Sequence, residues 1–320
     1  MDAADDMARR LLAGERPALA RMITWAENAD ARFALALALV YPRVGRAWRI
    51  GITGPPGAGK SSLANALIEK LRARGSTVGV LAIDPSSPYS GGALLGDRIR
   101  MEERTTDPGV YIRSMATRAS HGGLARAAVD ALDVMDAFGF DWLLAETVGV
   151  GQAEYEIAGA ADTVLVVLCP GAGDGIQAMK AGLLEVADVL VANKSDLAGA
   201  DQLVSDLEDA LALRALSRNQ RRAPLVVPVS AHDGSGLDAL LAAIETHRRE
   251  LESGDLAALR REKRVRQVRR VVGERLDEAL FGSAGRTEQA AALLGKSRTP
   301  YDVAEELLSS ILASTHRTRA

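Results

Sequence analysis

Short apolar segments alternate with helical patterns through the middle of the chain, from residue 48 to about residue 251. Seven apolar runs predict strands, at residues 49–53, 77–83, 110–113, 142–145, 163–169, 189–192 and 225–229. Amphipathic stretches, such as 61–74 and 122–138, lie between most of these runs and predict helices. Apolar strands separated by helices indicate a mostly parallel sheet with helices on both faces, an α/β fold. Ligands of such sheets bind at the carboxyl ends of the strands.

Both ends of the chain have helical spacing instead. The first part predicts two or three short helices, with starts marked by Pro17 and Asp30. Its apolar faces combine Leu11, Leu12, Leu19, Met22, Ile23 and Trp25. After about residue 255, a long helix has an apolar side and a dense basic face, which is typical of a solvated surface, and a second short helix follows at 300–313. We predict a helical segment at 1–45, an α/β domain at 46–252 and a helical arm at 253–320.

Composition narrows the class of protein. The 320 residues are 48% hydrophobic and 25% charged, with a net charge of -3, which are ordinary globular proportions. The single cysteine, Cys169, excludes an intramolecular disulfide and fits a reducing cytoplasm. The acidic N-terminus is unlike a secretory signal, and no stretch has the ~18 apolar residues of a membrane span. We therefore expect a cytoplasmic protein that binds neither membranes nor nucleic acid.

The segment after the first predicted strand matches the phosphate-binding pattern G-x-x-x-x-G-K-[ST], and a predicted helix follows it. Its residues are Gly54, Pro55, Pro56, Gly57, Ala58, Gly59, Lys60 and Ser61, and Ser62 comes next in the helix. Glycines let backbone N–H groups surround the phosphates, Lys60 reaches the β and γ oxygens, and Ser61 ligates magnesium. The pattern predicts a P-loop nucleotide site, and the alternative is a turn that binds nothing.

A second motif predicts which base is bound. The apolar strand at 189–192 ends in Asn193, Lys194 and, two positions on, Asp196. The Asp196 carboxylate can accept from guanine N1–H and the 2-amino group, and adenine lacks both donors, so it would leave that charge unpaired. Val229, Ser230 and Ala231, at the end of the last strand, resemble the backbone segment that contacts guanine O6 in GTPases. Ser230, Ala231 and His232, which comes next, are included in the predicted GTP site. The alternative for residues 193–196 is a turn that caps a helix.

The strand at 142–145 leads into a candidate site for magnesium and the γ-phosphate. Glu146 ends it and can hold the ion, and Gly149 can bring a backbone N–H to the γ-phosphate. Many GTPases place a water-orienting Gln directly after that glycine, where this chain has Val150. We therefore predict hydrolysis that is slow until a partner accelerates it. Gln152 lies two residues further on and is the alternative that could partly substitute.

Two further acids suit the magnesium environment. Asp84 ends the strand at 77–83, and Asp97 lies in the Gly- and Ser-rich segment that follows it. The alternative for Asp97 is the cap of a helix at 98–104.

These motifs together resemble one family, the GTPase chaperones of adenosylcobalamin-dependent acyl-CoA mutases, of the methylmalonyl-CoA mutase-associated (MeaB, MMAA and ArgK) type. The stretches that carry the likeness are GITGPPGAGKSSL, DPSSPYSGGALLGDRIRM, ETVGVGQ, GAGDGIQAMKAG, NKSD and VSA. The N-terminal and C-terminal helical segments are similar too, so the likeness covers nearly the whole chain. Older naming connected the same family with arginine and ornithine transport kinases.

The resemblance implies more than the motifs do. It implies a homodimer through the C-terminal arm and a mutase partner, with adenosylcobalamin involved only through that partner. Mg²⁺ and GTP or GDP would be the chain's own ligands. Ser61, Asp84, Asp97 and Glu146 would form the magnesium environment. Residues 171–182 would be a further switch loop, in which Asp174, Gln177 and Lys180 signal to the mutase, although many members carry a larger side chain at the position of Gly175. The alternative for 174–180 is an ordinary helix start.

Three other functions stay open at this stage. A metal-delivering GTPase of the nickel-chaperone type would need Cys or His clusters, whereas Cys169 is alone and the four histidines are scattered. A kinase of a transport system would need an acceptor pocket beside the γ-phosphate. A binding module without hydrolysis would not need the magnesium residues.

Overall fold

The computed structural model of the protein describes residues 2–85, 106–117, 123–147, 159–171, 183–217, 224–281, 284–294 and 299–317. The chain forms two compact units, Met1–Arg260 and Arg261–Ala320. The N-terminal helices thus belong to the same unit as the α/β part. The finer division into three segments stays a prediction.

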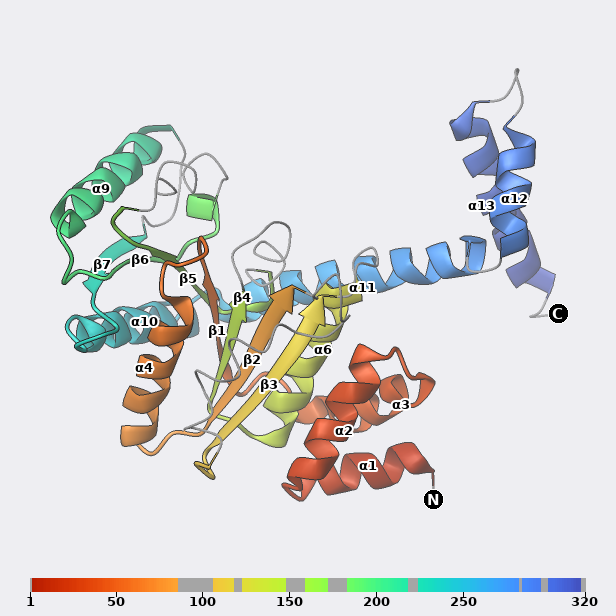
Figure 1. Ribbon diagram of the computed structural model, residues 1–320. Helices are drawn as coiled ribbons and strands as arrows, with labels where there is room; N and C mark the ends of the chain where they lie inside the picture. Colours follow the sequence, from red (N-terminus) through yellow and green to blue (C-terminus); the bar gives the residue numbers. More distant parts are fainter. Residues whose placement is uncertain are drawn as a thin grey trace. The chain divides into compact units, whose positions relative to one another are not determined.

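A sheet of seven strands lies at the centre of the first unit, counted over the described residues (Figure 1). The strands are β1 (Trp48–Thr53), β2 (Val78–Pro85), β3 (Val110–Thr117), β4 (Trp142–Thr147), β5 (Thr163–Leu168), β6 (Val189–Asn193) and β7 (Leu225–Val229). All the pairs are parallel and the order is β3-β2-β4-β1-β5-β6-β7. The predicted parallel α/β fold is confirmed.

Strand β3 differs most from its prediction, which ended it at Arg113. It continues to Thr117 because its pairing with β2 runs on as far as Pro85 opposite Thr117. The apolar run in the sequence ends before the backbone pairing with β2 does, because the second half of β3 includes the polar residues Ser114 and Thr117. Backbone pairing, rather than side-chain hydrophobicity, sets this strand's end.

Helices cover both faces of the sheet. Helices α4 (Lys60–Ala73) and α10 (Leu237–Glu252) pack on one face, against a core that includes Trp48, Ile50 and Ile52 of β1. Helices α6 (Gly123–Phe138) and α9 (Ala200–Ser217) pack on the other face. Because side chains alternate along a strand, Arg49 of β1 points toward α6.

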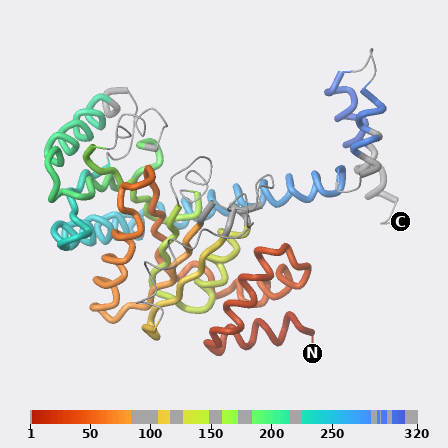
Figure 2. The backbone as a smooth tube through the Cα atoms, viewed as in Figure 1, coloured from red at the N-terminus to blue at the C-terminus, as the bar shows by residue number. Residues whose placement is uncertain are grey.

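The N-terminal helices pack against α6, and Figure 2 shows them in red beside that part of the sheet. They are α1 (Ala3–Leu12), α2 (Arg16–Glu27) and α3 (Ala31–Val40), followed by the 3-10 turn η1 (Tyr41–Arg43). The predicted starts are confirmed, since Pro17 lies in the first turn of α2 and the Asp30 carboxylate accepts from the Arg32 backbone N–H at 3.0 Å. The predicted apolar residues are buried, with Leu12 half-buried.

The C-terminal part contains α11 (Leu256–Phe281), α12 (Ala284–Leu293) and α13 (Pro300–Arg317). The sequence predicted one short helix after the long one, at 300–313, and the structure has two, so α12 was missed. Helix α12 is Ala-rich and has too few large apolar residues to show a helical period. Leu280, Val303 and Leu307 form the small core of this unit. Among the described residues, no helix has the length and apolarity that a bilayer crossing requires.

Candidate nucleotide-binding site

The strand order places the predicted motifs at one edge of the sheet. From β1 the chain builds β2, β3 and β4 on one side, and then β5, β6 and β7 on the other. Such a reversal of direction leaves a crevice at the carboxyl ends of the strands, where nucleotides bind. The phosphate loop after β1, Glu146 in β4, Asn193 in β6 and the segment after β7 all lie at these ends.

The phosphate loop turns sharply between β1 and α4, and two glycines make the turn possible. Gly54 has a φ of +140°, and a Cβ there would lie 2.1 Å from the Val167 carbonyl oxygen of β5. Gly59 has a φ of +88°, and its Cβ would lie 2.4 Å from Nδ2 of Asn193. Any larger residue would push the loop away from these two neighbours. The loop is therefore shaped by β5 and β6 as well as by its own sequence.

Lys60 is buried in the first turn of α4 and reaches back across this loop. Its Nζ donates to the carbonyl oxygens of Gly54 at 2.8 Å and Pro55 at 2.9 Å. These contacts hold the ammonium group over the loop, next to the N-terminus of α4. A positive charge and a helix N-terminus at one place favour a bound phosphate.

Ser61 and Glu146 meet behind the loop. The Ser61 hydroxyl donates to Oε1 of Glu146 at 2.5 Å, and both side chains are buried. Beside them, Thr147 donates to the Thr53 hydroxyl at 3.1 Å. Hydroxyl and carboxylate oxygens are the ligands that Mg²⁺ takes, so Ser61 and Glu146 fit the ion. Among the residues that the structure describes, no group of three or more His, Cys, Asp or Glu side chains is arranged to hold a metal ion.

Several predicted residues lie outside the described part of the chain. They are Asp97, Gly149, Asp174, Gln177 and Lys180. The backbone of Asp84 lies one residue before the end of β2, at the edge of the sheet where the phosphate loop lies, but its side chain is outside the described part. The roles given to these six residues remain predictions.

Asn193 connects the base motif to the phosphate loop. Its Nδ2 donates to the Ala58 carbonyl at 2.8 Å, and its Oδ1 accepts from the Ala231 N–H at 3.2 Å. One amide thus spans the ends of β1, β6 and β7. The next residue, Lys194, has a φ of +59°, so the chain turns abruptly there and leads to Asp196. The Ser195 N–H fixes this turn by donating to the Val229 carbonyl at 3.1 Å.

A cavity of about 320 Å³ opens between the base motif and the phosphate loop. This volume is within the range of small-molecule sites. The cavity is lined by Gly59, Ser62, Asn193, Lys194, Asp196, Leu197, Ala231 and His232. Seven of these eight were predicted from the sequence, and Leu197 was missed, although its place directly after Asp196 was a usable signal. Ser230 is buried beside the cavity and holds the loop, since its N–H donates to the Ser235 carbonyl at 3.0 Å.

Asp233 also holds the loop that carries His232. The Asp233 carboxylate accepts from the backbone N–H of Ser235 at 2.8 Å. Hydrogen bonds from Ser235, first from its backbone and then from its hydroxyl, lower the pKa of Asp233 below its usual value. This ionised carboxylate braces the turn between β7 and α10, so Ala231 and His232 are presented to the cavity by a fixed loop.

Comparisons with known proteins agree with this geometry. The model of one protein family, described as the methylmalonyl-CoA mutase-associated GTPase MeaB, matches residues 19–284. A protein of Pyrococcus horikoshii that is named as a GTPase is 43% identical, over 98% of this chain and 99% of its own. The mouse protein named methylmalonic aciduria type A homolog, mitochondrial, is 35% identical, over 80% of this chain and 66% of its own.

One solved structure resembles the whole chain. A crystal structure described as an LAO/AO transport system kinase has a TM-score of 0.73 and 28% identity, and the match covers 98% of this chain and 99% of that one. The match to the family extends from α2 to the start of α12, so it includes the phosphate loop, the base motif and all of α11.

Proposed function

The chain belongs to the family of methylmalonyl-CoA mutase-associated GTPases, and from this premise we propose that it is a G-protein chaperone that gates adenosylcobalamin delivery to an acyl-CoA mutase and protects that mutase. One observation carries the proposal, namely that the family match joins the nucleotide site and α11 in one stretch. The name of the mouse relative, which refers to methylmalonic aciduria, supports it. GTP is the substrate, and the purpose of its hydrolysis would be to change the state of the mutase.

Hydrolysis at this site depends on positioning and charge rather than on covalent chemistry. Lys60 would hold the β- and γ-phosphates, and Ser61 and Glu146 would hold the ion. Mg²⁺, when bound, neutralises charge on the phosphate oxygens. Gly149 would donate its N–H to the γ-phosphate, and Val150 beside it has no group to orient water. The chain alone would therefore hydrolyse GTP slowly, and a partner would supply what is missing.

Asp196→Asn is expected to reduce the preference for GTP over ATP by about a hundredfold. The carboxylate can accept two hydrogen bonds from guanine, and each bond to a charged group contributes about 1.5–3 kcal/mol. An amide would accept one of them and turn its NH₂ toward the other donor. Competition binding with labelled GDP measures the effect. Asp201→Asn, an exposed acid in the first turn of α9, is the control, and unchanged selectivity in Asp196→Asn would show that another residue reads the base.

The test of the chaperone function is GTPase turnover with and without purified candidate mutases, starting with methylmalonyl-CoA mutase and including related ones. We expect the correct mutase to accelerate hydrolysis by at least about tenfold and the cobalamin spectrum to change with nucleotide. Lys180→Ala should bind GTP normally and lose this acceleration. Equal acceleration of that variant would refute the switch assignment, and no response to any mutase would refute the chaperone role.

A kinase is the second candidate, because the solved structure with the whole-chain match is described as one. In a kinase the γ-phosphoryl group passes to an acceptor, whereas in a GTPase it passes to water. Labelled γ-phosphate from GTP that appears on a protein or small molecule would favour the kinase. Label that appears only as free phosphate favours the GTPase.

We also propose that the protein is a cytoplasmic homodimer joined through the arm. Helix α11 exposes three apolar side chains on one side, with Val265 46%, Val268 60% and Val272 51% exposed. Such a stripe at helical spacing is usually covered by a partner. Light scattering on the purified protein should give twice the chain mass of 33.8 kDa, and a mass of one chain would refute the dimer.

A further inference from the structure

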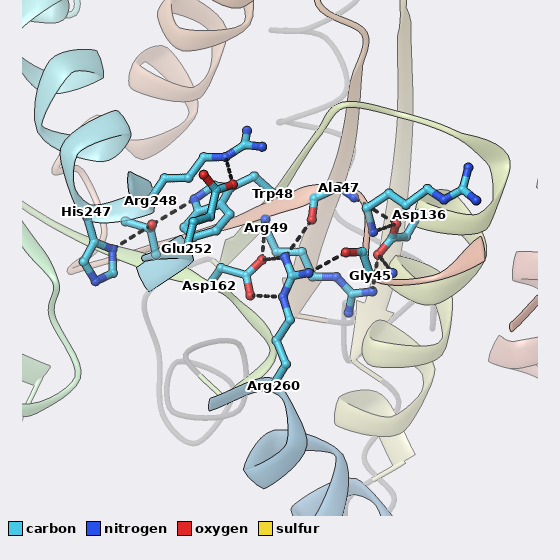
Figure 3. Close-up of polar contacts among 12 residues, drawn as sticks. Gly45, Ala47, Trp48, Arg49, Asp136, Asp162, His247, Arg248, Glu252 and Arg260 are labelled. Carbon is cyan, nitrogen blue, oxygen red and sulfur yellow. Dashed lines mark hydrogen bonds and ion pairs between the residues drawn. The ribbon is translucent and has the colours of Figure 1, made fainter. Parts of the chain in front are cut away.

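Three segments far apart in the sequence meet where β1 and β5 begin, and Figure 3 shows the polar contacts among them. They are the linker before β1, Asp162 directly before β5, and Arg260 in the first turns of α11. The Arg260 guanidinium donates Nε–H and Nη2–H to the two oxygens of Asp162 at 2.9 and 2.7 Å. It also donates to the carbonyl oxygens of Gly45 and, at 3.1 Å, Ala47. All three of its nitrogens are used.

Asp162 is the centre of this contact. Its side chain is 3% exposed, compared with 27% for Arg260. Besides the guanidinium it accepts from the Arg49 backbone N–H at 3.1 Å, and its own N–H donates to the Arg49 carbonyl at 2.7 Å. It therefore joins α11 to the first residues of both β1 and β5. A bidentate pair of this kind fixes direction as well as distance.

Both strands that Asp162 joins reach the phosphate loop at their other ends. Strand β1 leads directly into Gly54, and the Val167 carbonyl of β5 lies against Gly54 at the other end. The first compact unit ends at Arg260, although α11 continues beyond it to Phe281 as one helix. Arg260 is thus the last residue of α11 that belongs to the nucleotide-binding unit.

We propose that Arg260 is a positioning residue that ties the first turns of α11 to β1 and β5 through Asp162, and so couples nucleotide binding to the start of α11. A nucleotide that orders the loop restrains the two strands, and the strands restrain the helix. The inference rests on guanine nucleotide binding by the proposed site and is independent of any mutase.

Hydrogen exchange of the full chain, with and without GDP and Mg²⁺, tests this coupling. In the native protein, GDP should slow exchange of the amides at 256–264 by about fivefold or more, the lower end of usual coupling between sites. Arg260→Ala should remove this difference, with GDP affinity within about twofold of native, because the contacts of Lys60 and Asn193 are untouched. Asp162→Asn should do the same. Arg260→Lys, which cannot reproduce the fork, should retain part of the effect.

Arg261→Ala is the matched control, since it removes the same charge from the next residue, which is exposed. It should leave the GDP effect intact. An equal loss in Arg261→Ala, or no effect of bound GDP on these amides in the native protein, would overturn the proposal. If Arg260→Ala does not fold, the other two variants test the proposal. The GDP effect should then be lost in Asp162→Asn and reduced in Arg260→Lys, and a full effect in both would overturn the proposal. Failure of the native protein to bind GDP at all would instead refute the nucleotide site.

Discussion

Lys60→Ala is expected to lower the affinity for GDP and GTP by about two to four orders of magnitude. The Lys60 ammonium is buried over the phosphate loop, where carbonyl oxygens of Gly54 and Pro55 hold it. Each hydrogen bond between charged groups contributes about 1.5–3 kcal/mol, and Lys60 would make two of them to phosphate oxygens. Calorimetry with GDP and Mg²⁺ measures the loss. The variant should keep the melting temperature of the native protein, so that the loss of affinity cannot be explained by unfolding; a thermal melt checks this.

A lysine on the same helix provides the control. Lys70 of α4 is half-buried and pairs with the exposed Asp238 at 2.8 Å, at the surface of the protein. Exposed ion pairs contribute about 1 kcal/mol or less, so Lys70→Ala should bind GDP like the native protein. If both variants bind equally well, the phosphates do not lie on this loop, and the proposed nucleotide site is wrong.

The second large effect is expected on stability, from Asp136→Ala. The Asp136 carboxylate is 1% exposed and lies at the end of α6. It accepts from the backbone N–H groups of Gly45, Arg46 and Ala47 at 2.8, 3.0 and 3.0 Å, and from Nη2 of Arg49 at 2.9 Å (Figure 3). One carboxylate therefore fixes the whole linker between the N-terminal helices and β1.

The buried charge of Arg49 makes the stability of the protein depend on the acids around it. Burial favours the neutral form of its guanidinium, but the charges of Asp133 and Asp136 and the hydrogen bonds to them raise the pKa of Arg49 above its usual value. Arg49 thus stays charged inside the protein. Asp136→Ala leaves Arg49 paired with Asp133 alone and removes the acceptor of three linker N–H groups. Loss of a partner from a buried ion pair typically costs about 3–5 kcal/mol, and a buried donor left without an acceptor adds to that cost. We expect a loss of that size for Asp136→Ala.

Denaturation in urea, followed by tryptophan fluorescence, measures the free energy of unfolding. Asp209→Ala, an exposed acid on α9, should change it by less than about 0.5 kcal/mol. Asp136→Asn should lose less stability than Asp136→Ala and more than Asp209→Ala, because its amide oxygen still accepts from the linker N–H groups. A loss below about 1 kcal/mol in Asp136→Ala would mean that the linker is held by other contacts.

The sequence alone predicted the parts of this protein that neighbouring residues determine. Seven apolar runs became the seven strands, because the inner strands are buried on both faces and such burial demands continuous hydrophobicity. The phosphate loop and the segment from Asn193 to Asp196 were recognised for a similar reason. Their chemistry requires fixed residue types at fixed spacing, directly after a strand. The family resemblance followed from these short motifs and is confirmed.

Only the tertiary structure decided which distant residues meet. In the sequence, Arg49 is one charged residue at the start of an apolar strand, and Asp133 and Asp136 are acids on a helix that would suit solvent. The partners of Arg49 lie 84 and 87 positions away, and Arg260 lies 98 positions from Asp162. No local pattern encodes such pairs. Their energies depend on burial and on angles between side chains, which exist only once the sheet has brought the segments together.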